Sequence, residues 1–123
     1  MKITQLEKIV VDALEDIKAR DIEVIDTTKL TPLFERVIVA TGDSGRQVRA
    51  LANHVREKLQ ANGVQILSTE GEENGEWVLV DSGDIVVHIM QPAIRTYYSL
   101  EELWGGKGPA RVRQETTQTK AVE

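Results

Sequence analysis

"WVLVDSGDIVVHIM", residues 77–90, decides the fold, because two β-branched runs flank a Ser-Gly pair within it. We expect residues 77–81 and 84–90 to form strands that a tight hairpin at Ser82-Gly83 joins. Side chains alternate along each strand. One face of the hairpin is wholly aliphatic and belongs in the core: Val78, Val80, Ile85, Val87 and Ile89. The other face mixes apolar and polar side chains: Trp77, Leu79, Asp81, Val86, His88 and Met90.

Two amphipathic helices are predicted upstream of the hairpin. The first covers roughly residues 4–20, where Thr4 and Glu7 form a capping-box pair ahead of an apolar stripe. The second begins after Ser44, its N-cap, and ends at Asn62-Gly63. Beyond the hairpin, Pro92 opens a helical turn through Tyr98, and Ser99 can cap another short one.

Three further strands complete the predicted sheet: "DIEVIDTT" (21–28), "LFERVIVATG" (33–42) and "VQILST" (64–69). The order α-β-β-α-β-β-β-α predicts a single α/β (α+β) domain, with a mixed five-stranded sheet and flanking helices. The strand–helix–strand unit of residues 34–69 favours one parallel pair, whereas the hairpins are antiparallel.

Composition narrows the possible functions. The 123 residues, 41% of them hydrophobic, are enough for one domain with a real core. The absence of cysteine excludes disulfides, thiolate metal sites and a cysteine nucleophile, and it fits a reducing, cytoplasmic location. No apolar run approaches the roughly 20 residues that cross a membrane. Glu7, Lys8 and Asp12 interrupt the N-terminal apolar positions, so we expect no signal peptide.

Charge is distributed unevenly along the chain. Residues 1–104 hold 11 basic and 18 acidic side chains, a net charge of −7. Such a body is repelled by phosphate backbones, so extensive direct nucleic-acid binding is disfavoured and a basic protein surface is a better partner. The plainer alternative is that the charge keeps a small domain soluble. We expect residues 106–123 to form a disordered tail, since they show no periodicity and little to bury.

The hairpin could be an active site or a binding surface. Asp81 and Asp84 flank the turn on opposite strands, where turn capping is a better explanation than catalysis or a paired-carboxylate metal site. His88 and His54 are isolated from each other, so we expect no metal. If the helices cover the aliphatic face, a partly exposed Trp77 and Met90 suit binding. Alternatively, the C-terminal turns cover this second face completely.

"ATGDSGRQ", residues 40–47, raises the possibility of an enzyme. A Gly-rich turn between a strand and a helix can bind anions, and a similar Gly-Ser turn occurs in nucleotidyltransferases. Those enzymes also need paired carboxylates on a neighbouring strand, and "VLVDSGDIVV" lacks that spacing. Asp43 would repel a triphosphate. The plainer reading is a structural turn at Gly42 with Ser44 as N-cap, and a nucleotide-binding or nucleotidyltransferase-like enzyme is the alternative.

Three blocks of sequence resemble the ribosome silencing factor family, also called Iojap-like. They are "VIVATGDSGRQVRALANHV", "GEWVLVDSGDIVVHIM" and "RTYYSLEELWG". The resemblance covers residues 3–105 and implies a silencing-factor domain over residues 1–105, with a nucleotidyltransferase-like fold without catalytic carboxylates. It further implies a protein that is not an enzyme and needs no cofactor.

The resemblance also implies a partner. Members bind the large ribosomal subunit through its small protein L-fourteen, block joining of the small subunit when nutrients are scarce, and have a suggested role in large-subunit assembly. The docking surface that the resemblance implies consists of Trp77, His88, Met90, Arg95, Tyr98 and Trp104. Gly83 and Asp84 are assigned to the turn, and Leu100 and Leu103 to packing. The same apolar patch could pair with itself in a homodimer, and a dimeric regulatory module for another protein is a further alternative.

Overall fold

The computed structural model describes residues 1–97, so predictions on residues 98–123 lie outside it. The described chain confirms the predicted class, a mixed five-stranded sheet with flanking helices. Its elements are α1 (Ile3–Asp16), β1 (Arg20–Asp26), β2 (Arg36–Thr41), α2 (Gly45–Ala61), β3 (Ser68–Glu70), β4 (Trp77–Asp81), β5 (Ile85–Met90) and α3 (Pro92–Tyr97). Among these residues, none of the helices is long and apolar enough to cross a membrane.

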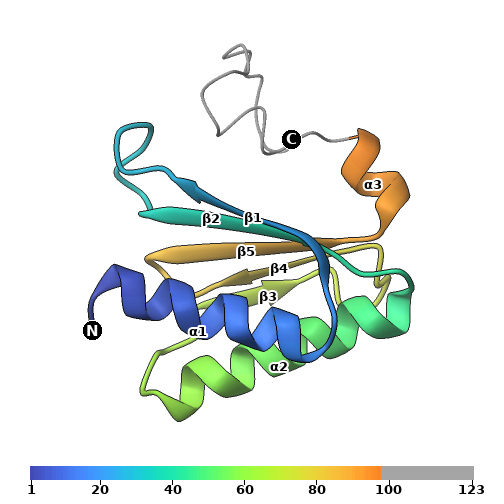
Figure 1. Cartoon of the computed structure of the whole chain (residues 1–123), viewed down its shortest axis with the longest axis horizontal. Helices are drawn as coiled ribbons and strands as arrows, with labels where there is room; N and C mark the ends of the chain where they lie inside the picture. The colour runs from blue at the N-terminus through green and yellow to red at the C-terminus, as the bar shows by residue number, and fades with distance from the viewer. Residues whose placement is uncertain (98–123) are drawn as a thin grey trace.

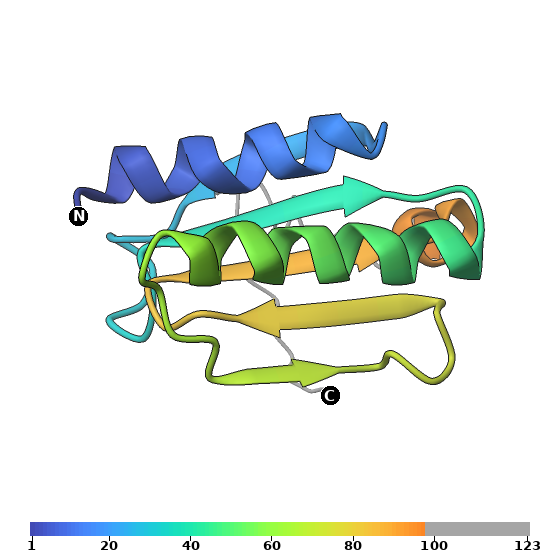
Figure 2. The same cartoon turned by 90° about the horizontal axis from the view of Figure 1, so that it is seen from below.

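The strand order is β1-β2-β5-β4-β3. β2 and β5 are parallel, and the other three neighbouring pairs are antiparallel. The sheet has one parallel pair, as expected, but the predicted partners were wrong: β2 pairs with β5 and not with β3, to which α2 connects it. α2 joins β2 to β3 at the far edge, and the β4–β5 hairpin lies between them (Figure 2). The hairpin of residues 77–90 thus occupies the centre of the sheet.

Two helices cover one face of this sheet. α1 and α2 lie side by side across it, and α3 lies on the opposite side (Figures 1 and 2). Their apolar stripes pack against the aliphatic face of the hairpin, and Val10, Leu14, Leu51 and Leu59 are fully buried there. Val78, Val80, Ile85, Val87 and Ile89 are all buried in the same cluster, as their alternation predicts.

We call the face opposite α1 and α2 the open face. Its side chains on the three central strands are Val37, Val39, Thr41, Trp77, Leu79, Asp81, Val86, His88 and Met90. A smaller apolar cluster forms here, where Val37, Val39 and Met90 are buried and Ile94 of α3 packs against them. α3 lies over one end of this face (Figure 1).

The helix α1 differs from its prediction at both ends. It begins after Lys2, whose backbone N–H donates to the Gln5 side chain, so the Thr4–Glu7 capping box is wrong. Glu7 instead accepts a 2.8 Å bond from Arg36 of β2. The helix stops at Asp16 rather than near residue 20, because Lys18 adopts a φ of 62° and turns the chain toward β1.

Four strands are shorter than predicted: β1, β2, β3 and, by its first residue, β5. Residues 27–35 form a loop that Thr27 closes. Its N–H donates to the Glu35 carbonyl at 3.0 Å, and its hydroxyl donates to the Phe34 carbonyl at 3.1 Å. This loop removes residues from the predicted ends of β1 and β2. Residues 64–67 are also outside β3, because only Ser68–Glu70 pairs with β4.

Candidate functional site

A cross-strand row on the open face runs through all five strands. The registers place Glu23 of β1 beside Val39, Val39 beside His88, His88 beside Leu79, and Leu79 beside Glu70 of β3. The two glutamates are exposed, whereas Val39 is buried and His88 and Leu79 are partly exposed. The open face therefore has an apolar centre with one histidine and a carboxylate at each edge.

Trp77 and His88 form a pair beside this row. Trp77 lies opposite Met90, so it is diagonal to His88 across the β4–β5 hairpin. The indole Nε1–H donates to His88 Nδ1 at 3.0 Å, and the ring centroids are 5.8 Å apart with planes tilted by 49°. Both side chains are partly exposed, so the elements within residues 1–97 leave part of the open face uncovered.

The ring of His88 is neutral at physiological pH. Burial among apolar neighbours lowers the pKa of His88 from 6.5 to about 4. A neutral ring that accepts at Nδ1 carries its proton on Nε2. The pair therefore presents a defined tautomer as well as a defined indole orientation.

Met90 does not have the partial exposure that its position on this face suggested. Its side chain is fully buried against Val37 and Val39. Its backbone carbonyl accepts from the N–H of Gly42. The expectation of an exposed Met90 is wrong because β2 and Ile94 of α3 pack around it, and neither contact can be read from the hairpin alone.

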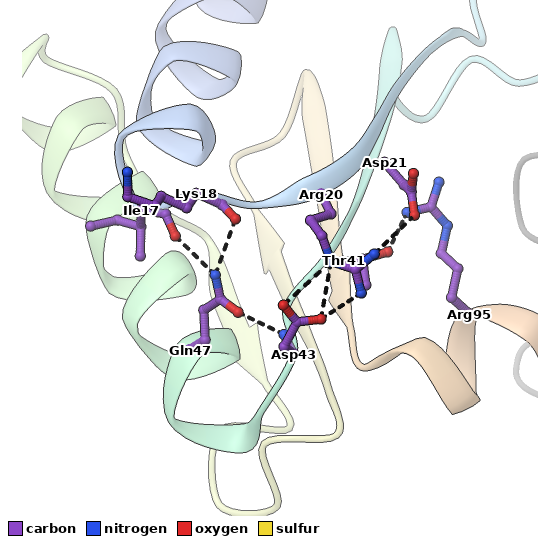
Figure 3. Close-up of polar contacts among 8 residues, drawn as sticks. All are labelled: Ile17, Lys18, Arg20, Asp21, Thr41, Asp43, Gln47 and Arg95. Carbon is purple, nitrogen blue, oxygen red and sulfur yellow. Dashed lines mark hydrogen bonds and ion pairs between the residues drawn. The ribbon is translucent and has the colours of Figure 1, made fainter.

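Arg95 connects α3 to the end of β2. Its Nη1 donates to the hydroxyl of Thr41 at 2.8 Å, and Thr41 is buried (Figure 3). Arg95 is partly exposed and lies at the same end of the sheet as Trp77 and Met90. Two other residues of the predicted docking surface, Tyr98 and Trp104, lie outside the described residues.

The turn between β4 and β5 is held by its own polar groups. The Asp81 carboxylate accepts from the N–H of Gly83 at 2.8 Å, and Gly83 has a φ of 94° that favours glycine. The backbone carbonyl of Asp84 accepts from Glu35 and Arg36, which ties the turn to β2. Within residues 1–97, histidine and carboxylate side chains form no cluster of three or more that could hold a metal ion.

The Gly42 turn is occupied by the protein's own side chains (Figure 3). The Asp43 carboxylate accepts one bifurcated bond from Arg20 Nε–H, at 3.0 and 3.3 Å, and a second bond from Arg20 Nη2 at 2.5 Å, and the Asp43 N–H donates to the Gln47 side chain. Ser44 is the N-cap of α2 and accepts from the Gln47 N–H at 3.1 Å. A side chain at Gly42 would come within 2.9 Å of Val48, so this glycine serves close packing. The Asp43 carboxylate and the N–H groups of Gly42, Asp43 and Gln47 are therefore engaged within the protein.

Sequence reasoning missed several residues of these arrangements. Arg20 and Gln47 close the Gly42 turn from β1 and α2, and Glu23 and Glu70 bound the open face. No local pattern distinguishes these four from other polar side chains, because strand order and register bring them into place. Pairing β1 with β2 in the correct register would have revealed Glu23.

Comparisons with known proteins identify relatives of this chain. The family model described as "Ribosomal silencing factor during starvation" matches residues 1–123. The chain is 60% identical over 110 residues to the Ribosomal silencing factor RsfS of Chromobacterium violaceum, an alignment covering 89% of this chain and 90% of that protein. A crystal structure of a protein from the same organism aligns with a TM-score of 0.84 and 53% identity, covering 99% of this chain and 98% of that chain.

A eukaryotic relative is more distant. The Mitochondrial assembly of ribosomal large subunit protein 1 of Mus musculus is 30% identical over 97 residues, which make up 76% of this chain and 42% of that protein.

Proposed function

Because the chain belongs to the ribosomal silencing factor family, we propose that it lowers translation by binding the large ribosomal subunit and preventing the small subunit from joining. The contact is with the ribosomal protein L-fourteen, through the open face of the sheet. The name of the mouse relative, which refers to large-subunit assembly, supports the choice of subunit. A role in large-subunit assembly belongs to the same proposal.

The cross-strand row is the observation that carries this proposal. Interfaces combine an apolar, partly aromatic centre with a polar rim. The open face has this arrangement, with Trp77, Leu79 and His88 near the centre and Glu23 and Glu70 at the edges. Carboxylates at the rim favour a basic partner and speed its association. A protein of the ribosome that lies against rRNA offers such a surface.

A subunit-joining measurement tests the proposal. Purified large subunits are incubated with the protein, small subunits are added, and the joined particles are quantified on a sucrose gradient. We expect joined particles to decrease as the protein is added, and the protein to sediment with free large subunits. Sedimentation with translating ribosomes in equal amount would contradict the blocking mechanism.

The rim supplies a charge test within the same assay. Glu23→Lys with Glu70→Lys should slow association with large subunits by about tenfold at low salt, and the difference should shrink at high salt. Glu57→Lys with Glu73→Lys makes the same change in net charge and is the matched control, because both side chains are exposed and neither belongs to the row. Equal effects of the two pairs would show that only net charge matters.

The enzyme alternative is disfavoured by the internally occupied Gly42 turn. The Asp43 carboxylate lies where a phosphate would need to approach, and Arg20 neutralises that carboxylate rather than a ligand. We therefore propose that the protein is not an enzyme. Isothermal calorimetry with magnesium and each nucleoside triphosphate should give no stoichiometric binding, and stoichiometric binding of any of them would revive the alternative.

The free protein is proposed to act in the cytoplasm and to form a homodimer through the open face, since the apolar centre of this face can be covered by a second copy. Sedimentation equilibrium should then give a dimer mass for the wild type and a monomer mass for Trp77→Ala. A monomeric wild type at micromolar concentration would contradict self-association.

A further inference from the structure

The contact between Trp77 and His88 is more specific than burial of two rings requires. A tryptophan on a sheet face can settle in several rotamers, but here its Nε1–H donates to His88 Nδ1 at 3.0 Å. The histidine is flanked by its cross-strand neighbours Val39 and Leu79. Its ring is therefore confined, whereas the larger indole lies at the end of β4 beside the loop of residues 71–76.

We propose that His88 is a positioning residue for the docking surface: its Nδ1 fixes the orientation of the Trp77 indole on the open face. This inference rests on the proposed function, since it assigns a role within the proposed binding surface. A fixed indole reduces the entropy that binding would otherwise cost, because an ordered side chain has less freedom to lose. His88 acts through Trp77 and need not touch the partner.

The protonation state of His88 agrees with this role. Only an unprotonated Nδ1 accepts a hydrogen bond. Burial lowers the pKa of His88 from 6.5 to about 4, so the ring is unprotonated at physiological pH. The neutral ring then has its proton on Nε2. These properties describe a ring used as a hydrogen-bond acceptor rather than as a cation.

Two substitutions test the hydrogen-bond acceptor of His88 separately from the space that its ring fills. His88→Asn places a carboxamide oxygen one bond from Cγ, close to the position of Nδ1, and so retains an acceptor. His88→Leu fills a similar space among apolar neighbours and has no acceptor, so it should fold. His54→Leu on α2 is the control, because His54 contacts Asp16 at 3.0 Å on the helical side of the molecule.

The free protein is examined first by NMR. In the wild type, the Trp77 indole N–H should be hydrogen-bonded and the His88 ring should be the Nε2–H tautomer. His88→Leu should shift the indole signal and speed its exchange with solvent, and His88→Asn should restore it. Trp77→Phe identifies the signal. An indole signal that His88→Leu leaves unchanged would overturn the proposal, whatever the result with ribosomes.

Binding to large subunits is measured next in a double-mutant cycle. His88→Leu should weaken binding by about tenfold, and His88→Asn should stay within about threefold of the wild type. In the Trp77→Phe background, which has no indole N–H, His88→Leu should cause no further loss beyond about twofold. If His88→Leu weakened binding by the same tenfold in the Trp77→Phe background, His88 would contact the partner directly, which contradicts a positioning role.

The two measurements distinguish the proposals from each other. A wild type that does not bind large subunits refutes the proposed function, and the indole signal of the free protein still decides whether His88 positions Trp77. A wild type that binds, with unchanged binding in His88→Leu, refutes the positioning role alone.

Discussion

At the scale of single residues, His88 has the clearest consequence for stability. Its pKa in the folded state is lowered to about 4, from 6.5 in the unfolded chain. The unfolded state therefore binds more protons between these values, so the stabilising contribution is complete above pH 6.5 and is lost as the pH falls toward 4. We expect the free energy of unfolding to fall by up to about 3 kcal/mol across this window, relative to His88→Asn.

Chemical denaturation at a series of pH values checks this expectation. The difference between the wild type and His88→Asn isolates His88 from the carboxylates, which titrate in both proteins. A constant difference between pH 7 and pH 4 would show that the folded-state pKa is not lowered.

Trp77 contributes to both folding and the proposed binding. It is partly exposed but packs against the cluster of Met90, Val37 and Val39, and it bonds to His88. Trp77→Ala should therefore cost about 1–3 kcal/mol of stability, less than the ~3–5 kcal/mol of a fully buried tryptophan. Binding to large subunits should fall by roughly 30-fold or more, as for an aromatic near an interface centre.

Thermal denaturation and co-sedimentation, measured on the same preparation of Trp77→Ala, separate these effects. Val39→Ala is the matched control, because Val39 is fully buried on the same face and its loss should reduce stability more than binding. Equal binding losses in the two variants would mean that Trp77 acts only through folding.

At the scale of elements, Gln47 connects the two long helices. Its Nε2 donates to the carbonyls of Ile17 and Lys18 at the end of α1, at 3.0 and 3.2 Å, and its Oε1 accepts from the Asp43 N–H (Figure 3). Gln47→Ala leaves these backbone groups without this partner and should cost about 1–2 kcal/mol of stability. Gln60→Ala, at an exposed site on α2, should change stability little; equal losses would contradict the connecting role.

The end of α1 offers a stabilising substitution. Lys18 has a φ of 62°, in the left-handed region where a side chain is strained and glycine is not. Lys18→Gly should raise the free energy of unfolding by up to about 1 kcal/mol, measured by urea denaturation. Lys8→Gly in the middle of the same helix should lower it by about 1 kcal/mol, and a loss in both variants would show that Lys18 is not strained.

At the scale of the whole molecule, the division between domain and tail remains a sequence-based prediction. We propose a domain over residues 1–105 and a disordered tail over 106–123. Deleting the tail should leave the melting temperature nearly unchanged, because its sequence offers almost no apolar area to bury. Ribosome association should weaken slightly, since Lys107, Arg111 and Arg113 can reach nearby RNA. A large fall in melting temperature would contradict this division.

Much of the fold was predictable because its signals are local. The alternation in residues 77–90 and the Ser-Gly pair specify a hairpin with one aliphatic face, and the two apolar stripes specify the helices that cover that face. Ser44 was recognised as the N-cap because capping involves neighbours three residues apart. Element boundaries were less accurate, because the ends of β1, β2 and β3 depend on which residues find a partner strand.

The sequence by itself determined the fold class, the hairpin, the amphipathic helices and an acidic body without an evident catalytic constellation. Only the tertiary structure decided that β2 pairs with β5, that Met90 is buried, that Arg20 closes the Gly42 turn, and that Glu23 and Glu70 bound one row. The physical reason is the separation along the chain between the residues that interact. Periodicity and capping record contacts within a few residues, whereas strand order and register join residues far apart in the chain, and it is register that places Trp77 against His88.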